Sequence, residues 1–372
     1  LLLENIHPDG AAALEKAGFV VETMDRALEG EELAARLEGV HVLGIRSKSQ
    51  VTAAHLREAD SLLAVGAFCI GTDQIDLAAA TDTGIAVFNA PYSNTRSVVE
   101  LALAEVIALT RGLVQKNTMM HEGVWDKSAA GAHEVRGRAL GIVGYGNIGA
   151  QLSVLAESLR KDVYFYDTVD KLALGNARRC GSLEELLAVS DVVTLHVDGR
   201  QGNAGLFGEP QFAAMKQGAL FLNLSRGFVI DTAALRDHLA SGHLGGAAVD
   251  VFPVEPAGRG EEFRNELRGL PNVILTPHIG GSTQEAQQDI GRFVAGKLVD
   301  FVADGSTVLS VNLPPLSLAE HEGTHRLAHL HQNVPGVLAA INSVLAEHGV
   351  NVEGQLLGTR GESGYVLTDI GV

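Results

Sequence analysis

Three charged residues in the second half of the chain have the types and spacing expected of acid–base chemistry. Arg226 lies in Asn-Leu-Ser-Arg-Gly, Glu255 lies between Val254 and Pro256, and His278 lies in Thr-Pro-His-Ile-Gly-Gly. An arginine can hold a carboxylate through two parallel hydrogen bonds, and a histidine can accept a hydroxyl proton near neutral pH. A carboxylate on the other ring nitrogen would fix the histidine tautomer. We therefore predict oxidation of a hydroxy acid, with Glu255 orienting the base.

Each of these residues also has a simpler interpretation. Arg226 could be a surface charge, Glu255 a turn residue between two prolines, and His278 a helix cap or a satisfied loop histidine. The three become a catalytic candidate when they occur together beside a nucleotide-binding fold.

A glycine-rich motif predicts a dinucleotide-binding site. It consists of Gly144, Tyr145, Gly146, Asn147, Ile148 and Gly149. An apolar strand pattern precedes it and a helical pattern follows, so the backbone can approach a pyrophosphate at a helix N-terminus. Asp167 ends the next strand pattern, where a carboxylate accepts hydrogen bonds from ribose hydroxyls and repels a 2′-phosphate, which favours NAD over NADP. The alternatives are an ordinary strand–turn–helix and a solvated turn aspartate.

Six apolar runs after Ala139 predict a doubly wound parallel sheet. They cover residues 140–144, 163–166, 192–195, 219–223, 247–250 and 273–275. Arg226, Glu255 and His278 follow the last three runs. Loops at the carboxyl ends of parallel strands converge on one crevice, so we expect these side chains to lie together there.

An earlier α/β series and a short tail flank this central part. Strand patterns at 40–45, 62–65 and 85–88 predict another parallel sheet, and helical patterns at 98–109 and 283–303 predict crossovers between domains. The tail predicts a strand, a helix from Pro335 and two more strands, the opening βαββ of a ferredoxin-like βαββαβ unit. The second helix and last strand of that unit do not follow in the sequence.

The predicted fold is therefore α/β, with two Rossmann-like doubly wound domains and a partial ferredoxin-like tail. Residues 1–93 and 281–315 are expected to form a discontinuous substrate-binding domain, 94–280 the NAD-binding domain and 323–372 the tail.

Composition excludes several classes of protein. The 372 residues carry a net charge of −17, which argues against nucleic acid or an anionic membrane as the main partner. Cys69 and Cys180 are the only cysteines, too few for a disulfide framework or a cysteine-based metal site, and we expect no metal. No apolar run suits a membrane helix and the start lacks a signal pattern, so a soluble cytoplasmic protein is expected.

Four long segments resemble the D-isomer-specific 2-hydroxyacid dehydrogenase family. They are residues 45–49, 88–98, 141–149 and 276–283, in that order. The resemblance implies an NAD-dependent oxidoreductase with Arg226, Glu255 and His278 as its catalytic set and Asp250 near the nicotinamide amide. One departure is Asp198-Gly199, where the family more often has proline.

The resemblance also places Arg46, Ser47, Lys48 and Asn94 near the substrate. The residues agree, because an Arg-Ser-Lys loop after a strand in an acidic protein suits a phosphate, although a solvated turn is the alternative. A phosphorylated 2-hydroxy acid is therefore the expected substrate. Lys127 is expected to reach the substrate of a neighbouring subunit of a homotetramer.

The tail resembles an ACT domain, which in such dehydrogenases binds L-serine between two subunits and restrains the enzyme. The resemblance implies His331, Asn333 and Asn351 as serine ligands. Amide and imidazole donors suit a small zwitterion, but Asn333 could equally be a helix N-cap and Asn351 a turn residue.

Two other functions fit the same residues. One is a dehydrogenase for another 2-hydroxy acid, such as glycerate or 2-hydroxyglutarate. The other is an NAD-sensing binding protein, because the C-terminal binding protein corepressors share this fold and the same three catalytic residue types.

Overall fold

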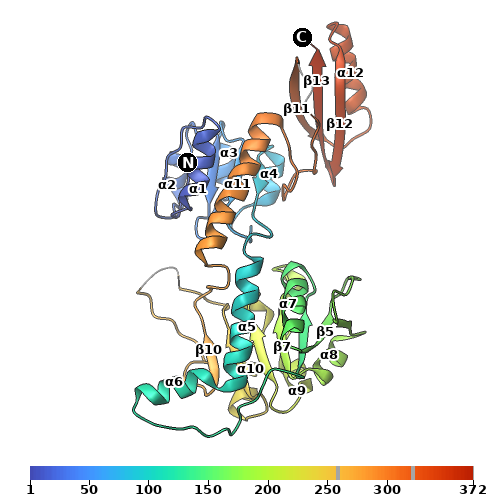
Figure 1. The fold of residues 1–372 in the computed structure, drawn as a ribbon. Coiled ribbons are helices and arrows are strands. Elements are labelled where there is room, and N and C mark those ends of the chain that lie inside the picture. The colour runs from blue at the N-terminus through green and yellow to red at the C-terminus, as the bar shows by residue number, and fades with distance from the viewer. Residues whose placement is uncertain (257–259, 320–322, 372) are drawn as a thin grey trace. The chain divides into compact units, whose positions relative to one another are not determined.

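The computed structural model describes residues 1–256, 260–319 and 323–371. The chain divides into two compact units, one formed by residues 94–286 and the other by residues 1–93 together with the chain from residue 287 onward. The helices and strands of the two units are labelled in Figure 1.

A parallel sheet of seven strands forms the centre of the unit 94–286. The strands are β4 (Ala139–Val143), β5 (Asp162–Tyr166), β6 (Arg178–Arg179), β7 (Val192–Leu195), β8 (Leu220–Asn223), β9 (Gly246–Val249) and β10 (Val273–Leu275). Their order is β10-β9-β8-β7-β4-β5-β6, so the direction of winding reverses between β4 and β7. Ligands of such sheets bind outside the carboxyl ends of the strands at this reversal.

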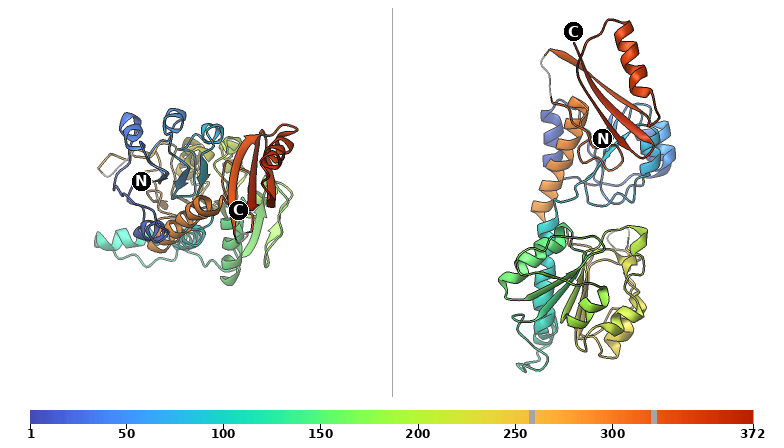
Figure 2. Two further views of the ribbon diagram at one scale, coloured as in Figure 1. Left: turned by 90° about the horizontal axis from the view of Figure 1, so that it is seen from above. Right: turned by 90° about the vertical axis from the view of Figure 1, so that its right-hand side faces the viewer.

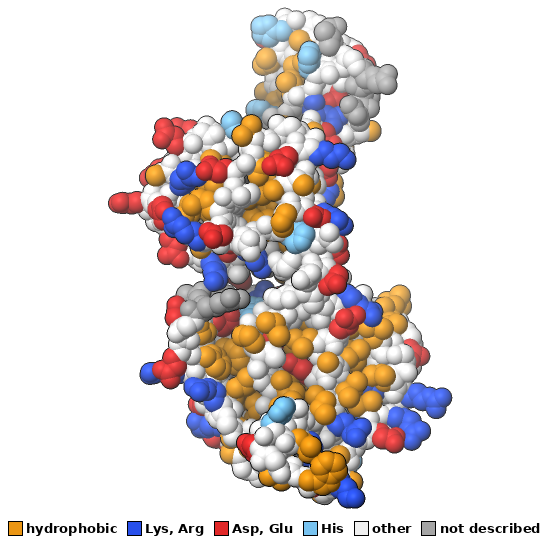
Figure 3. All heavy atoms as spheres, turned by 60° about the vertical axis from the view of Figure 1, so that its left-hand side comes forward, with side chains coloured by type: hydrophobic (Ala, Val, Ile, Leu, Met, Phe, Trp, Pro, Cys, Tyr) orange, Lys and Arg blue, Asp and Glu red, His pale blue; other side chains and the backbone are white. Residues whose placement is uncertain are grey.

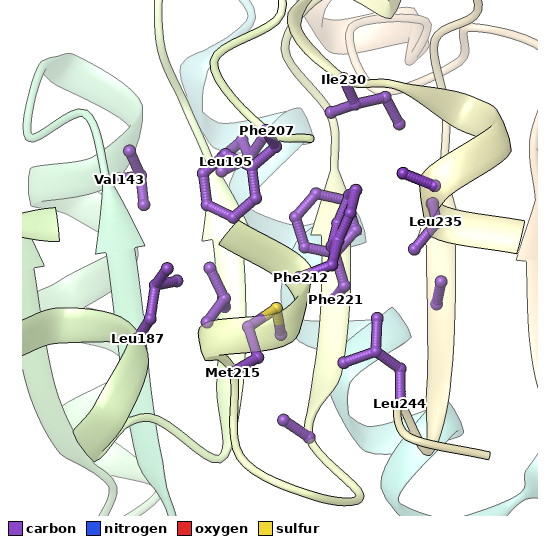
Figure 4. Close-up of a cluster of buried hydrophobic side chains, with 14 of the residues drawn as sticks. Val143, Leu187, Leu195, Phe207, Phe212, Met215, Phe221, Ile230, Leu235 and Leu244 are labelled. Atoms are coloured by element: carbon purple, nitrogen blue, oxygen red, sulfur yellow. The ribbon is translucent and has the colours of Figure 1, made fainter. Parts of the chain in front are cut away.

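Helices cover both faces of this sheet. They are α5 (Thr95–Arg111), α7 (Asn147–Ser158), α8 (Leu183–Val189), α9 (Glu209–Ala214) and α10 (Thr232–Ala240). The helix α6 (Leu113–His121) buries none of its residues, and short 3-10 turns lie at Gln201–Asn203 and Gly227–Val229. Side chains of α5 and α7 pack on one face, beside Ile142 and Leu222. Side chains of α8, α9 and α10 pack on the other, where Phe207, Phe212 and Phe221 form an aromatic cluster (Figure 4). Burial on two faces explains the nearly continuous apolar strands.

The other unit has a second parallel sheet, made of β1 (Val42–Ile45), β2 (Ala64–Ala67) and β3 (Ala86–Phe88). Leu2 extends it through parallel bridges to Gly44 on one side and to Thr23 on the other. The spatial order is therefore Thr23, Leu2, β1, β2, β3, and the winding reverses between the first segment of the chain and β1. This is a doubly wound order with its own ligand-binding edge.

Helices also cover both faces of this second sheet. They are α1 (Pro8–Lys16), α2 (Gly30–Arg36), α3 (Ala53–Glu58), α4 (Leu77–Asp82) and α11 (Gln284–Asp304). Side chains of α2, α3 and α4 pack on one face, and side chains of α1 and α11 on the other. The helix α11 lies so close that a Cβ added at Gly66 would come within 2.7 Å of Val294.

The tail is an antiparallel sheet of three strands with one helix. It contains β11 (Thr324–Gln332), α12 (Val337–Glu347), β12 (Val352–Arg360) and β13 (Ser363–Gly371), in the sheet order β11-β13-β12. The helix lies on one side of the sheet (Figure 2), and the side chains of Asn342 and Gln355 bond helix to strand. The predicted α/β fold class with a βαββ tail is confirmed.

The start of α12 differs from the sequence-based expectation. The helix begins at Val337, and its N-cap is Gly336 with a φ of 94°. Pro335 therefore precedes the helix, because the left-handed glycine turns the chain between them. Asn333 is not the N-cap: its backbone N–H donates to the carbonyl of Glu362 at 2.7 Å, and its side chain donates to the carbonyl of Gly361 at 3.1 Å.

Over the described residues, no helix is both long and apolar enough to cross a membrane. The same residues contain no group of three or more histidine, cysteine or acidic side chains placed to hold a metal ion.

Candidate active site

The carboxyl edge of the seven-stranded sheet brings the three predicted catalytic residues to neighbouring loops. Arg226 follows β8, Glu255 follows β9 and His278 follows β10, and these three strands are adjacent in the sheet. The strands are parallel, so all three loops leave the same edge.

His278 and Glu255 form a direct pair. Nδ1 of His278 lies 2.9 Å from Oε2 of Glu255, and the backbone N–H of Phe252 donates to Oε1 of Glu255 at 3.0 Å. A carboxylate held at both oxygens fixes the proton on Nδ1, so Nε2 is the nitrogen that can accept a proton from a substrate.

The contact between His278 and Glu255 changes the pKa values of both side chains in the direction that makes His278 a better base. The hydrogen bond that His278 donates to Glu255 raises the pKa of His278 above its ordinary value, although burial acts against it. Burial alone would raise the pKa of Glu255, but the hydrogen bonds from His278 and Phe252 outweigh it and lower that pKa. The carboxylate therefore stays ionised beside the imidazole.

Arg226 lies close enough to act electrostatically on both members of the pair. Its charge lowers the pKa of His278 and that of Glu255. Gly227 explains the proximity, because a Cβ there would lie 2.0 Å from the carbonyl carbon of Phe252, so only glycine lets the Arg226 loop approach the Glu255 loop. The guanidinium donates to the carbonyl of Ser225 at 2.9 Å and is half-buried.

The loop after β7 also approaches Arg226, at the position where the sequence departs from the family. A Cβ added at Gly199 would lie 3.3 Å from Nε of Arg226. Asp198 forms an ion pair with Arg200, and the hydrogen bonds from that arginine lower the pKa of Asp198, with a smaller contribution from Arg226. The departure therefore places a second carboxylate near Arg226.

Asp250 shapes the loop that carries His278. Its side chain is 1% exposed and accepts hydrogen bonds from Thr276 Oγ1 at 2.6 Å and from the N–H groups of Ile279 and Gly280 at 2.8 Å each. Its carbonyl accepts the N–H of His278 at 2.8 Å. These bonds hold His278 at a φ of 54°, a conformation that few non-glycine residues adopt.

The glycine motif has the geometry that a dinucleotide needs. Gly144 has a φ of 91°, and a Cβ there would lie 2.6 Å from the carbonyl oxygen of His196. A Cβ at Gly149 would lie 2.3 Å from the carbonyl oxygen of Gly144, whereas the space around Gly146 is open. The helix α7 begins at Asn147 without a side-chain cap or an acidic residue in its first turn. Its N–H groups and dipole therefore suit a pyrophosphate, and the residues present fit NAD.

Asp167 follows β5 at the same edge. Its Oδ2 accepts the N–H of Tyr145 at 2.8 Å and its Oδ1 accepts the N–H of Val169 at 2.9 Å. These bonds tie the carboxylate to the glycine turn, and each oxygen retains an acceptor position suited to a ribose hydroxyl.

Sequence reasoning did not single out His196, which follows β7 on the opposite side of the reversal. Its Nε2 lies 3.0 Å from Thr194 Oγ1, and its buried Nδ1 has no partner among the described residues. Burial lowers the pKa of His196 to about 3, so the ring is neutral. The only indication in the sequence is that this histidine directly follows the apolar run 192–195.

The remaining predicted substrate residues are spread over both units. Arg46, Ser47 and Lys48 follow β1, with Arg46 half-buried and the other two exposed. Asn94 precedes α5, and its side chain packs on Gly281, near the His278 loop. Lys127 is exposed on the segment that follows α6.

The three predicted effector residues lie on the tail. Nδ1 of His331, on β11, donates to the carbonyl of Gln332 at 2.6 Å, and the buried Nε2 of His331 has no partner among the described residues. The side-chain amide of Asn333 donates to the carbonyl of Gly361. Asn351 precedes β12, and its amide donates to Glu353 at 2.6 Å.

Comparison with known proteins gives two family matches. A family model of the NAD-binding domain of D-isomer specific 2-hydroxyacid dehydrogenases matches residues 103–280. A family model of the ACT domain like that of the AHAS small subunit matches residues 327–371.

Known proteins match this chain over all or most of its length. A D-3-phosphoglycerate dehydrogenase of Haemophilus influenzae is 52% identical over 371 residues, which cover 100% of this chain and 90% of the relative. The structure of a D-2-hydroxyisocaproate dehydrogenase has a TM-score of 0.75 at 26% identity and covers 84% of this chain and 99% of its own. An NAD complex of a formate dehydrogenase from Staphylococcus aureus has a TM-score of 0.68 at 29% identity, covering 80% of this chain and 89% of its own.

These matches confirm the resemblance and the predictions of an enzyme and of NAD as its cofactor. They also confirm an ACT-type tail. The chain belongs to the D-isomer-specific 2-hydroxyacid dehydrogenase family and is an NAD-dependent dehydrogenase.

Proposed function

We propose that the protein oxidises D-3-phosphoglycerate to 3-phosphohydroxypyruvate with NAD, the first step toward L-serine. The observation that carries the proposal is the pair of His278 and Glu255, held at 2.9 Å beside Arg226 on neighbouring loops. The relatives named D-3-phosphoglycerate dehydrogenase support this choice of substrate among the 2-hydroxy acids.

Arg226, Glu255 and His278 divide the chemistry among them. The guanidinium of Arg226 binds the substrate carboxylate in a forked geometry and so fixes the hydroxyl carbon. Nε2 of His278 removes the hydroxyl proton as the carbonyl forms. Glu255 keeps the Nδ1 proton in place and stabilises the imidazolium that results.

The cofactor is held by the residues at the reversal of the sheet. The N–H groups at the start of α7 and the glycines Gly144, Gly146 and Gly149 receive the pyrophosphate, with Asn147 and Ile148 beginning the helix, and Asp167 binds the adenosine ribose. Asp250 contributes on the nicotinamide side. Bound NAD supplies the acceptor for the hydride that leaves the substrate carbon.

The phosphate of the substrate is assigned to Arg46, Ser47 and Lys48. Two cations and a hydroxyl on consecutive residues can surround a phosphate with charge-assisted donors. Asn94 is a further substrate ligand, because it packs on the loop region next to His278. Lys127 is assigned to the substrate of a neighbouring subunit.

The test is turnover of purified protein with NAD and D-3-phosphoglycerate, followed by NADH absorbance. Folded protein that produces no NADH at high substrate and cofactor concentrations would reject the proposal.

A panel with glycerate and 2-hydroxyglutarate tests whether the enzyme prefers another 2-hydroxy acid. An Arg46→Ala variant should raise the KM for the phosphorylated substrate far more than the KM for glycerate. If His278→Ala abolished turnover but left the biological effect intact, NAD sensing would be the better function.

The protein is also proposed to form a homo-oligomer and to be inhibited by L-serine. Hydrophobic side chains gather on the surface of the NAD-binding unit (Figure 3). Leu113, Met120 and Trp125 of this unit are exposed. Such a surface suits a homo-oligomer, and the family resemblance implies a tetramer. Light scattering would measure the number of subunits.

L-serine is proposed to bind at His331, Asn333 and Asn351 and to inhibit the enzyme. A cytoplasmic location is proposed because the chain has only two cysteines, Cys69 and Cys180, too few for the disulfide framework of a small secreted domain.

A further inference from the structure

The loop that follows β1 lies at the reversal of the second sheet, opposite the end of the first segment of the chain. Leu2 bridges Gly44 of β1 on one side and Thr23 on the other, all in parallel. Glu4 leaves the carboxyl end of that first segment, and Arg46, Ser47 and Lys48 leave the carboxyl end of β1. The edge between two such strands is where doubly wound sheets hold their ligands.

Glu4 binds the backbone of this loop with both carboxylate oxygens. Oε2 accepts the N–H of Lys48 at 3.0 Å, and Oε1 accepts the N–H of Ser49 at 2.9 Å. Glu4 is 7% exposed, so the two bonds are shielded from water. A carboxylate that accepts two backbone donors fixes the direction of the peptide planes and of the side chains they carry.

Backbone contacts in turn hold Glu4 in place. The N–H of Glu4 donates to the carbonyl of Arg26, and that of Asn5 donates to the carbonyl of Met24, both at 3.2 Å. Glu4 has a φ of 62° and Asn5 a φ of 53°. Two consecutive non-glycine residues in the left-handed region are rare, and such strain persists where the surroundings require it. Here the left-handed backbone directs the carboxylate of Glu4 toward the loop.

Two further contacts fix the ends of the loop. At its start, the amide of Gln74 donates to the carbonyl of Arg46 at 2.5 Å. At its end, Ser49 is fully buried, and its hydroxyl accepts the N–H of Leu28 at 3.3 Å. The backbone from Arg46 to Ser49 is therefore held at both ends and in the middle, while the side chains of Ser47 and Lys48 are exposed.

We infer that Glu4 is a positioning residue for the phosphate of the substrate: it holds the backbone of the Arg46–Ser49 loop so that the side chains of Arg46, Ser47 and Lys48 present a preformed anion site. This inference rests on the proposed function. It also assigns the recognition of phosphate to side chains, because Glu4 already occupies the N–H groups of Lys48 and Ser49. Gln74 supports the same loop from its other side.

The sign of the effect separates positioning from plain electrostatics. Glu4 is an anion beside an anion site, so removing its charge would by itself tighten the binding of a phosphate. Loss of the hydrogen bonds that order the loop would instead weaken the binding of a phosphate, since the side chains would have to be ordered again on binding. The two accounts therefore predict opposite changes in affinity for the same substitution.

The experiment compares Glu4→Gln and Glu4→Asp with the wild type and with Glu15→Gln, an exposed glutamate on α1. Steady-state constants are measured for D-3-phosphoglycerate, D-glycerate and NAD, and the affinity for inorganic phosphate is measured by calorimetry. We expect both Glu4 variants to raise the KM for D-3-phosphoglycerate about tenfold, the loss expected for a hydrogen bond to a charged group. The kcat and the KM values for glycerate and NAD should stay within twofold, and Glu15→Gln should match the wild type.

Hydrogen exchange supplies a readout that does not depend on activity. The N–H groups of Lys48 and Ser49 should exchange slowly in the wild type and faster in both Glu4 variants. A KM for D-3-phosphoglycerate that falls or stays constant in Glu4→Gln would overturn the inference, as would equal changes for both substrates.

The same measurements tell this failure from a failure of the proposed function. If the wild type does not oxidise D-3-phosphoglycerate, the proposed substrate is wrong. Inorganic phosphate then decides the inference: weaker binding in both Glu4 variants, with normal binding in Glu15→Gln, supports it. No binding to the wild type, or unchanged binding in the variants, overturns it.

Discussion

Nδ1 of His278 lies 2.9 Å from Oε2 of Glu255, although 23 positions separate the two residues in the chain. They meet because β9 and β10 are adjacent parallel strands and their loops leave one edge of the sheet. Asp250 completes the arrangement, since its carboxylate holds the N–H groups that follow His278. The orientation of the base is therefore built into the sheet and does not require a substrate to create it.

Replacing Glu255 by glutamine should lower kcat about 10²-fold or more, the range expected for acid–base catalysis. The pH profile carries a second signature. Oxidation needs neutral His278, so kcat/KM of the wild type falls as the pH drops through the raised pKa of His278. Without the carboxylate that pKa decreases, and the acidic limb of the profile should move to lower pH.

Glu209→Gln is a matched control for this change. Glu209 pairs with His238 at 2.9 Å, also through a carboxylate and an imidazole, but on α9 and α10, away from Arg226. We expect its kcat and pH profile to equal those of the wild type. An acidic limb that stays in place in Glu255→Gln would show that another group controls the profile.

Replacing Arg226 by lysine should raise the KM for the 2-hydroxy acid by roughly 10-fold to 100-fold, while the KM for NAD stays constant. Lysine keeps the charge but cannot donate two parallel hydrogen bonds to one carboxylate. Arg236→Lys is the control, because Arg236 forms surface ion pairs with Asp237 and Glu266. Equal KM values for Arg226→Lys and the wild type would remove the carboxylate-binding role.

The sequence predicts the parts of the site that follow from strand order. Apolar runs identify the strands, and the convergence of parallel carboxyl ends brings Arg226, Glu255 and His278 together without any knowledge of side-chain contacts. The glycine motif can be predicted for a similar reason, because the strand, the glycine turn and the start of the helix follow one another directly in the sequence. The two-residue strand β6 was missed because Arg178-Arg179 has no apolar pattern.

The parts that could not be predicted depend on contacts between segments distant in sequence. The contact of Glu4 with the N–H groups of Lys48 and Ser49 spans more than 40 positions and requires the parallel bridge of Leu2 to Gly44. No local pattern marks Glu4 as buried. The close approach of the His196 carbonyl to Gly144 is similar, because it depends on β7 pairing with β4.

Replacing Asp167 by asparagine should reduce the preference for NAD over NADP about tenfold. The change keeps the shape of the side chain but removes the charge that repels a 2′-phosphate. The ratio of kcat/KM for the two cofactors measures it. Asp170→Asn is the control, because Asp170 is exposed and pairs with Arg179. A ratio that stays at the wild-type value would show that other residues select the cofactor.

Glu105, on α5, should make the unfolding free energy depend on pH. Its side chain is 3% exposed, and neither carboxylate oxygen has a hydrogen-bond partner among the described residues. Burial, with a smaller contribution from the charge of Asp250, raises its pKa to about 8. The folded state therefore keeps a proton that the unfolded chain releases near pH 4.5, and stability falls as the pH rises from that value to about 8.

Glu105→Gln removes this titration, so the variant should lose less stability than the wild type between pH 5 and pH 8. The difference between the two should grow by a few kcal/mol over this interval, and urea unfolding at both pH values measures it. Glu100→Gln is the control on the same helix, because Glu100 is exposed and pairs with Arg96. If the curves of unfolding free energy against pH run parallel for Glu105→Gln and the wild type, Glu105 is ionised in the folded protein, and a donor must then face it.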